Sequence, residues 1–552
     1  RLRHHAPALG ALGGLVVLAI WPMPLAPATT VVGPPYGDMP DHLWGTWWFG
    51  RGLSSGRFPT ATNLSHFPDT LDFWYVDPLG ALLALPFHGL GPALAWNALV
   101  FLQLLLAALA AYAVGWDLAR SRGAALLAGV VGGLSPYAMG LVHSGLSECL
   151  ALAPVILFVP LSLRALGLDP LGRSPRSRHW LYAALALGLA GTASAYYGLF
   201  GALFLLSTVL GPGWRQRLPV AARLLAVAGA VALPAAAMGL ASLGSEGAVT
   251  AANAPGWTGR LPATDLLTFL TPGEYYFPDT PAAGNPGVLH VNYLGWTAIA
   301  LAALVARGPF LRVGLVYLLF ALGPRLAVHG QVVMVGQSSV LLPLGFLSFP
   351  GSPFGMVHQP YRMVALLVPW LAMAAAMASA RVPARWRPPL ALLALAETLL
   401  LSPSPWPLAT RPAPDASLYA GIPGPVLDWP PDASRLNRDY LVDATAHGLA
   451  VPYGVNVFLP EKLREDPLVD RLLRALNDLD GHARNRDVPW TGSILASPNG
   501  TTTRLGTMGF AAVVVHKSAL DDREWGRTRA LLREALGAPA REDAAVAVWD
   551  LR

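Results

Sequence analysis

The chain has 552 residues, of which 54% are hydrophobic and only 13% are charged. It contains many apolar runs long enough to cross the roughly 30 Å hydrocarbon core of a bilayer, which excludes an ordinary soluble protein and predicts a polytopic α-helical membrane protein. The formal net charge is +6, yet residues 403–552 hold 17 basic and 19 acidic residues, so residues 1–402 hold 21 basic and 13 acidic ones. Because the arginines lie between apolar runs, they predict anchored cytoplasmic loops and no nucleic-acid partner. The single cysteine, Cys149, excludes a disulfide framework within one chain.

The first apolar run, residues 7–26, follows a basic start that includes Arg1 and Arg3. The positive-inside rule therefore predicts a cytoplasmic N-terminus. No small-residue cleavage site follows the run, so we expect a retained first helix and not a signal peptide. Residues 31–92 would then form a large extracytoplasmic loop, which also carries Asp69, Asp72 and Asp77.

Asp38, Asp41 and His42 open this loop. Asp38 is a predicted helix N-cap, with Pro40 in the first turn and Asp41 three residues on. At this spacing the two carboxylates can converge on one metal ion or on a hydroxyl group, where one of them could act as a general base. The alternative is helix capping beside a solvated loop, and His42 either orients a carboxylate or lies at the interface. The same helix places four apolar residues on one side, as in a helix lying flat in the headgroup region: Leu43, Trp44, Trp47 and Trp48.

The run at residues 180–210 is ambiguous, because it exceeds one crossing yet falls short of two full ones. A single crossing would place Arg381, Arg385 and Arg387 outside, so we favour a hairpin of two short helices that turns near residues 192–198. This gives about eleven transmembrane helices and an extracytoplasmic end to the last one. The predicted spans are 7–26, 93–116, 123–142, 146–166, two within 180–210, 219–242, 293–306, 310–326, 361–380 and 389–401.

A proline-rich linker at 403–407 separates a membrane domain, residues 1–402, from a tail of ordinary soluble composition, residues 403–552. Residues 511–516 and 544–549 read as buried strands, and 524–536 as an amphipathic helix between them. We expect the tail to be an extracytoplasmic α/β domain.

These features together resemble the GT-C class of integral-membrane glycosyltransferases, which take sugars from polyprenyl-phosphate carriers. The resemblance covers the whole chain as architecture, but only Asp38 and Asp41 as a motif. Members of the class usually carry adjacent or once-separated acidic residues there, whereas this chain has Asp-x-x-Asp, which leaves open which residue is the base. Segments 347–350 and 358–362 look like the external loop and span start found late in many bacterial members. The resemblance implies a multi-pass protein of the bacterial inner membrane.

Arg362 would lie at the outer membrane surface, where its guanidinium could pair with a lipid phosphate and offset charge on the leaving group. The alternative is an arginine that snorkels next to a tyrosine. Glu148, near the start of a span, is costly unless it is paired or hydrated, and the same holds for Glu397 in the last span. The remaining candidate substrate-binding residues are His42, Arg260 and His358.

Nucleotide sugars are made in the cytoplasm, and the predicted cytoplasmic loops are too short to bind one, so an external site needs a donor that has already crossed the membrane. The sequence therefore predicts transfer of a sugar from a polyprenyl-phosphate carrier to a glycan, lipid or protein acceptor. One aspartate would act as the base, while an arginine or a divalent cation, Mg²⁺ or Mn²⁺, steadies the phosphate. The alternative is a non-catalytic scaffold or envelope-complex subunit that binds a partner through its external tail. An ion-coupled transporter is disfavoured, because such proteins carry ionisable residues at mid-membrane depth.

Overall fold

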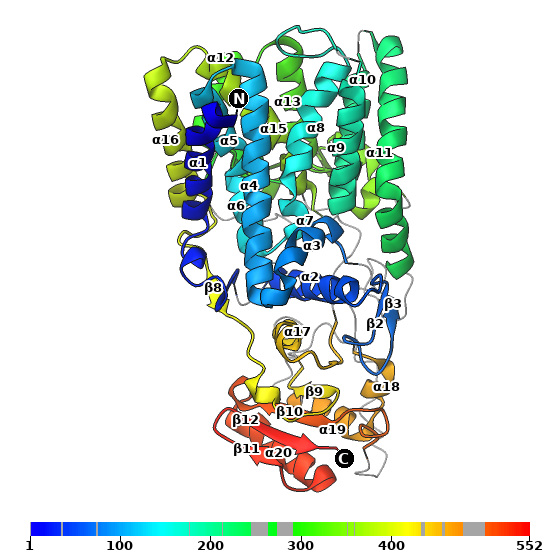
Figure 1. Ribbon diagram of the computed structural model, residues 1–552. Helices are drawn as coiled ribbons and strands as arrows, with labels where there is room; N and C mark the ends of the chain where they lie inside the picture. Colours follow the sequence, from blue (N-terminus) through cyan, green and yellow to red (C-terminus); the bar gives the residue numbers. More distant parts are fainter. Residues whose placement is uncertain are drawn as a thin grey trace. The chain divides into compact units, whose positions relative to one another are not determined.

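The computed structural model (Figure 1) describes residues 2–34, 37–72, 75–175, 177–211, 213–243, 263–272, 291–349, 352–357, 359–431, 436–454, 459–477 and 503–551. The chain forms two compact units. The first, here the bundle unit, comprises Arg1–His42, Val76–Ala237 and Gly259–Ala413. The second, here the sheet unit, comprises Leu43–Tyr75, Met238–Thr258 and Pro414–Arg552.

The bundle unit consists mainly of apolar helices that run side by side (Figure 1). Helix α15 is central, because 94% of its most apolar stretch is buried inside the protein. Helix α11 is peripheral, because only 11% of its most apolar stretch is buried. The helices are α1 (Leu2–Ala19), η1 (Met23–Leu25), α3 (Pro78–Ala84), η2 (Leu85–Leu90), α4 (Pro92–Ala119), α5 (Arg122–Gly133), α6 (Pro136–Ser144), α7 (Ser147–Leu150), α8 (Leu152–Ala165), α9 (His179–Ala193), α10 (Ala195–Val209), α11 (Trp214–Leu243), η3 (Leu266–Phe269), α12 (Trp296–Val305), α13 (Gly308–Ala321), α14 (Pro343–Leu347), η4 (Pro353–Met356), η5 (Pro360–Met363), α15 (Val364–Ser379), η6 (Ala384–Trp386) and α16 (Arg387–Leu401). Short strand pairs join β1 (Thr30–Val32) to β8 (Thr410–Pro412), β4 (Ala327–Val328) to β5 (Gln331–Val332) and β6 (Met334–Val335) to β7 (Ser338–Ser339).

Helices occupy every predicted span, but many are shorter than a full crossing. Among the described residues, four helices are long and apolar enough to cross a membrane, or five if the bent pair α5 and α6 counts as one span. That pair bends by 40°, where Leu134 and Ser135 interrupt the helix before Pro136. The count of about eleven spans stays a prediction. The four long spans are Pro92–Ala119, Ser147–Ala165, Trp214–Ala241 and Pro360–Ser379.

The ambiguous run at 180–210 forms two short helices, α9 and α10, with Ser194 between them. A Cβ built on Gly201 would lie 2.2 Å from Leu187 Cδ1, and one built on Gly198 would lie 3.0 Å from Gly191 Cα. Gly198 in α10 thus meets Gly191 in α9, and Gly201 meets Leu187. Since residue numbers rise along α10 while they fall along α9, the two helices are antiparallel. The glycines permit this close approach.

Glu397, on α16, has partners that the sequence did not reveal. It is 8% exposed, and its carboxylate accepts hydrogen bonds from the backbone N–H groups of Trp296 and Thr297 and from the Tyr293 hydroxyl. Trp296 and Thr297 open α12, where N–H groups have no partner within the helix. Glu397 therefore caps α12 from a neighbouring helix.

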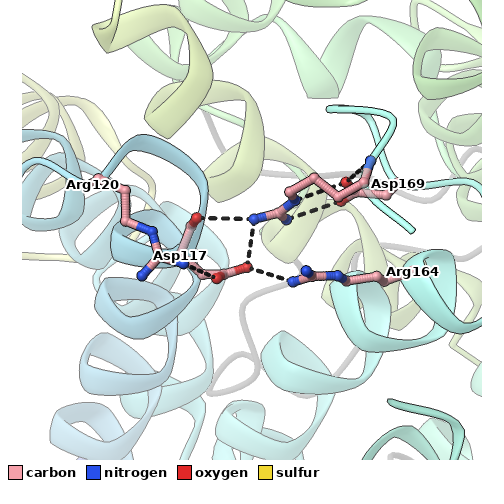
Figure 2. A network of polar contacts seen from close by, with 5 residues as sticks. Asp117, Arg120, Arg164 and Asp169 are labelled. Atoms are coloured by element: carbon pink, nitrogen blue, oxygen red, sulfur yellow. Dashed lines mark hydrogen bonds and ion pairs between the residues drawn. The ribbon is translucent and has the colours of Figure 1, made fainter. Parts of the chain in front are cut away.

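Several predicted cytoplasmic loops meet at one end of the bundle unit. Asp117, near the end of α4, pairs with Arg120 at 2.9 Å and with Arg164, at the end of α8, at 3.2 Å (Figure 2). Arg173 lies 3.0 Å from Asp117 and 2.8 Å from Asp169. These ion pairs tie the loop after α8 to the end of α4.

The N-terminus and the loop after α15 lie at the same end. Arg122 donates to the backbone carbonyl of His4 at 3.0 Å, and Arg387 donates to Ser121 Oγ at 2.6 Å. We call this the arginine end. Because α4, α8 and α15 all finish here, their first residues lie toward the opposite end, here the site end.

The sheet unit contains a four-stranded sheet in the order β11-β12-β10-β9. Adjacent strands in this sheet are antiparallel, except for β9 and β10, which are parallel. The predicted strands at 511–516 and 544–549 coincide with β10 and β12, and the predicted helix at 524–536 with α20, which begins with a capping box. Its elements are β2 (Ala61–Thr62), β3 (Leu71–Asp72), η7 (Ser417–Tyr419), β9 (Val426–Trp429), α17 (Leu436–His447), α18 (Glu461–Arg464), α19 (Pro467–Asn477), β10 (Ala512–His516), η8 (Lys517–Ala519), α20 (Asp522–Leu536), β11 (Arg541–Glu542) and β12 (Val546–Asp550).

Candidate functional site

The acidic motif lies at the start of helix α2 (Met39–Ser54), as predicted. Asp38 precedes the first helical residue and is partly exposed, whereas Asp41 and His42 are 8% and 7% exposed. Residues 41–50 are all buried. The helix therefore does not present the exposed polar face expected of one lying flat in the headgroup region.

His42 lies against the start of α7. Its Nδ1 is 3.1 Å from Ser147 Oγ, and its Nε2 is 3.4 Å from Glu148 Oε2. Ser147 and Glu148 are 2% and 7% exposed. Glu148 thus has the partner that a buried carboxylate needs.

Arg362, in η5, pairs with the other oxygen of the same carboxylate. Its Nη1 lies 3.2 Å from Glu148 Oε1, which also accepts from Cys149 Sγ at 3.3 Å. The guanidinium carbon lies 4.7 Å from the centre of the Tyr196 ring, in cation–π geometry. Arg362 is only 8% exposed, so its guanidinium is enclosed by protein and does not snorkel toward solvent. The reason is the buried Glu148 carboxylate, which neutralises it inside the protein. The place of Arg362 at the outer membrane surface stays a prediction.

Two tyrosines hold the backbone around this ion pair. The Tyr137 hydroxyl, from α6, donates to the backbone carbonyl of Arg362 at 3.3 Å. The Tyr197 hydroxyl, from α10, donates to the backbone carbonyl of Cys149 and lies 3.3 Å from the Tyr137 hydroxyl. Two helices, α6 and α10, therefore hold the backbone at Arg362 and at Cys149, next to Glu148.

Asp38 belongs to the same cluster, because it acts electrostatically on Tyr361, the neighbour of Arg362. We call Asp38, Asp41, His42, Glu148 and Arg362 the site cluster. Of the seven candidate residues predicted from the sequence, the structure brings three into contact, His42, Glu148 and Arg362. Asp38 and Asp41 lie at the start of α2, the helix that carries His42. The other two, Arg260 and His358, lie outside the described residues.

Asp77 lies beside the site cluster, although it was not among the residues predicted for the site. It is fully buried at the N-cap of α3, where its Oδ1 accepts from the Gly80 N–H at 2.8 Å and its Oδ2 from Gln103 Nε2 at 3.2 Å. Burial raises the pKa of Asp77 from 3.8 to about 6, against the opposing effect of hydrogen bonds from Gly80 and the Ser147 hydroxyl. The one sequence signal is the Asp-Pro pair at 77–78, which is typical of a helix start.

Among the residues that the structure describes, no group of three or more His, Cys, Asp or Glu side chains could hold a metal ion. Mg²⁺ is often bound by one or two carboxylates together with a substrate phosphate. A divalent cation at Asp38 and Asp41 therefore stays a prediction.

Neither a protein-family model nor a curated protein matches the sequence. Two cryo-EM structures of the arabinofuranosyltransferase AftD from mycobacteria match the fold. For the first, the TM-score is 0.51 at 14% sequence identity, and the match covers 100% of this chain and 40% of AftD. The second, of a mutant, has a TM-score of 0.49 at 15% identity and covers 100% and 41%.

The chain thus spans about two fifths of the length of the AftD chain, 40% in the first match. At such low identity the likeness shows the fold alone. AftD is a GT-C glycosyltransferase, so the predicted resemblance to the GT-C fold is confirmed.

Proposed function

We propose that this protein is a membrane glycosyltransferase that moves a sugar from a polyprenyl-phosphate carrier to an acceptor hydroxyl at the site cluster. The observation that carries the proposal is the buried Arg362–Glu148–His42 arrangement beside Asp38, within a GT-C-like fold. Ionisable groups buried inside a membrane protein are costly and typically mark functional sites. The fold likeness supplies the reaction class, and the cluster supplies groups that suit it.

The arrangement of charges supports an extracytoplasmic reaction. Arginines gather at the arginine end, and the positive-inside rule assigns that end to the cytoplasm. Ser147 and Arg362 lie near the starts of α8 and α15, toward the site end. A donor at the site end must already have crossed the membrane, which favours a lipid-linked sugar over a nucleotide sugar.

The proposed step is a single displacement at the anomeric carbon. The acceptor oxygen forms a bond to that carbon while the bond from the carbon to the phosphate oxygen breaks, and the electron pair leaves with the polyprenyl phosphate. Asp38 or Asp41 takes the hydroxyl proton as general base. The configuration at the anomeric carbon is thereby inverted.

Arg362 is the group that would stabilise the departing phosphate. Its Nη1 binds Glu148, while its buried Nε has no hydrogen-bond partner among the described residues. A guanidinium held by one carboxylate and one aromatic ring retains donors for a phosphate oxygen. Glu148 keeps this cation in place before the donor arrives.

The proposal is tested with purified protein in lipid nanodiscs and a panel of polyprenyl-phosphate sugars. Arabinofuranose is the first sugar to try, because the structural neighbour is an arabinofuranosyltransferase. We expect release of polyprenyl phosphate that is lost in Arg362→Gln and retained in Asp69→Asn. Asp69 is a matched control, since it lies in the same loop segment but pairs with Lys462 at 2.6 Å. Failure of the wild-type protein to consume any donor would contradict the proposal and favour a non-catalytic scaffold.

A further inference from the structure

A line of buried polar contacts leads from Asp77 to Glu148 through Ser147 and His42. Asp77 is at the N-cap of α3, Ser147 opens α7, and His42 lies in the first turn of α2. Three segments distant in sequence thus contribute to one chain of polar groups. The direction of each hydrogen bond follows from the chemistry of its partners.

Asp77 accepts every hydrogen bond that it makes. The Gly80 N–H and the Gln103 amide can only donate to it, at 2.8 and 3.2 Å, and the Ser147 hydroxyl donates as a third partner. An ionised carboxylate is an acceptor only. These three donors offset part of the cost of burying the charge.

The single Ser147 proton is therefore committed to Asp77. Ser147 Oγ lies 3.1 Å from His42 Nδ1 and can only accept a hydrogen bond from it. Only a protonated Nδ1 can complete this contact. The hydrogen-bond partners thus assign the tautomer, in the way that a histidine is fixed by the bond made at its other nitrogen.

We infer that Asp77, acting through Ser147, is a positioning residue that keeps His42 protonated at Nδ1 and directs Nε2 toward Glu148. The Nε2 atom lies 3.4 Å from Glu148 Oε2, while Glu148 Oε1 is held by Arg362 at 3.2 Å. A second proton, on Nε2, would make this contact an ion pair with the Glu148 carboxylate. The catalytic consequence rests on the proposed function, but the tautomer of His42 does not.

The side chain of Asp77 allows a sharp test. In Asp77→Asn the Gly80 N–H needs an acceptor, so the amide oxygen takes the position of Oδ1. The new NH₂ group then lies on the side of Gln103 and Ser147. Gln103 Oε1 has no partner among the described residues and can accept from that NH₂ group once the Gln103 amide rotates. The cap of α3 is kept, but the carboxylate that accepted the hydrogen bond from the Ser147 hydroxyl is gone.

The experiment reads the ¹⁵N chemical shifts of His42 in protein labelled at histidine, in lipid nanodiscs at about pH 8, where Asp77 is ionised. His42→Gln identifies the signal. We expect the Nδ1–H form in the wild type and in Ser162→Ala, which removes another fully buried serine, bonded at 2.8 Å to its own helix. We expect loss of that form in both Ser147→Ala and Asp77→Asn. An Nε2–H form in the wild type, or an unchanged signal in both variants, would overturn the inference.

Transfer kinetics test the consequence separately. The kcat should fall by about 10²-fold in Ser147→Ala and in Asp77→Asn, with the KM for the donor unchanged. His42 contacts the carboxylate that holds Arg362, the group that would stabilise the departing phosphate in the transition state. A protein without transferase activity would refute the proposed function and still leave the tautomer measurable. An altered tautomer with unchanged kcat would refute the catalytic role of the positioning.

Discussion

The Nη1 atom of Arg362 lies 3.2 Å from Oε1 of Glu148, across 214 positions of the sequence. The pair joins the start of α15 to the start of α8 through α7, and both side chains are 10% exposed. Glu148 also faces His42 through its second oxygen, at 3.4 Å. One carboxylate thereby organises two basic groups at the site cluster.

Breaking this pair should destabilise the protein strongly. Glu148→Ala leaves the buried guanidinium without its counter-charge, which costs about 3–5 kcal/mol in comparable buried pairs. Arg362→Ala should have a similar effect, and the double variant should lose less than the sum of the two. Thermal unfolding in detergent micelles provides the comparison. Additive losses would show that the two charges do not stabilise each other.

The cap that Glu397 provides to α12 predicts a second stability effect. Glu397→Ala leaves the partly buried N–H groups of Trp296 and Thr297 without their acceptor, which should reduce the free energy of unfolding by about 1 kcal/mol. Glu397→Gln should have a smaller effect, since it keeps one acceptor oxygen. The control is Glu534→Ala, because Glu534 is 50% exposed and pairs with Arg471 in the sheet unit. If the control destabilises the protein as much as Glu397→Ala, the capping role is wrong.

Asp77 predicts a dependence of stability on pH. Since its pKa is raised from 3.8 to about 6, the folded protein holds this proton more tightly than the unfolded chain does. The resulting stabilisation is complete below about pH 4 and is lost as the pH rises through about 6. The free energy of unfolding should therefore fall by about 3 kcal/mol between about pH 4 and about pH 7, relative to Asp77→Asn.

The measurement is thermal unfolding of both proteins across this pH range. Parallel profiles for the wild type and Asp77→Asn would contradict the raised pKa.

The proposed topology predicts which surfaces an impermeant maleimide can reach. The wild-type chain is a suitable background, since its one cysteine, Cys149, is fully buried. Ser55→Cys, an exposed position after α2, should be labelled in intact cells. Ser174→Cys, exposed beside the arginine end, should be labelled only after the cells are opened. The reverse pattern would place the site cluster in the cytoplasm and remove the reason for a lipid-linked donor.

Charge and hydropathy were sufficient to predict the hairpin α9–α10, because the arginines near 381–387 constrain the number of crossings. Local patterns were sufficient for β10, β12 and α20, whose apolar periodicity is strong. Span lengths were less predictable: a break such as Leu134-Ser135 depends on how the flanking helices pack, and the sequence shows only the Pro136 that follows.

The site was predictable as a set of residues and not as a set of contacts. His42, Glu148 and Arg362 stood out because charge is rare in such a chain, but their pairing joins distant segments and leaves no local pattern. Only the Asp-Pro pair at 77–78 distinguishes Asp77 from Asp69 and Asp72 in the sequence, and it does not show that the fold buries Asp77 fully beside Ser147.

The central claim is that carboxylates at the site cluster activate a hydroxyl against a lipid-linked sugar. It is tested most directly by measuring sugar transfer by Asp38→Asn and Asp41→Asn, each compared with the wild type at equal amounts of folded protein. We predict that both variants fold and insert normally and that at least one of them abolishes transfer. Full activity in both variants would contradict the account.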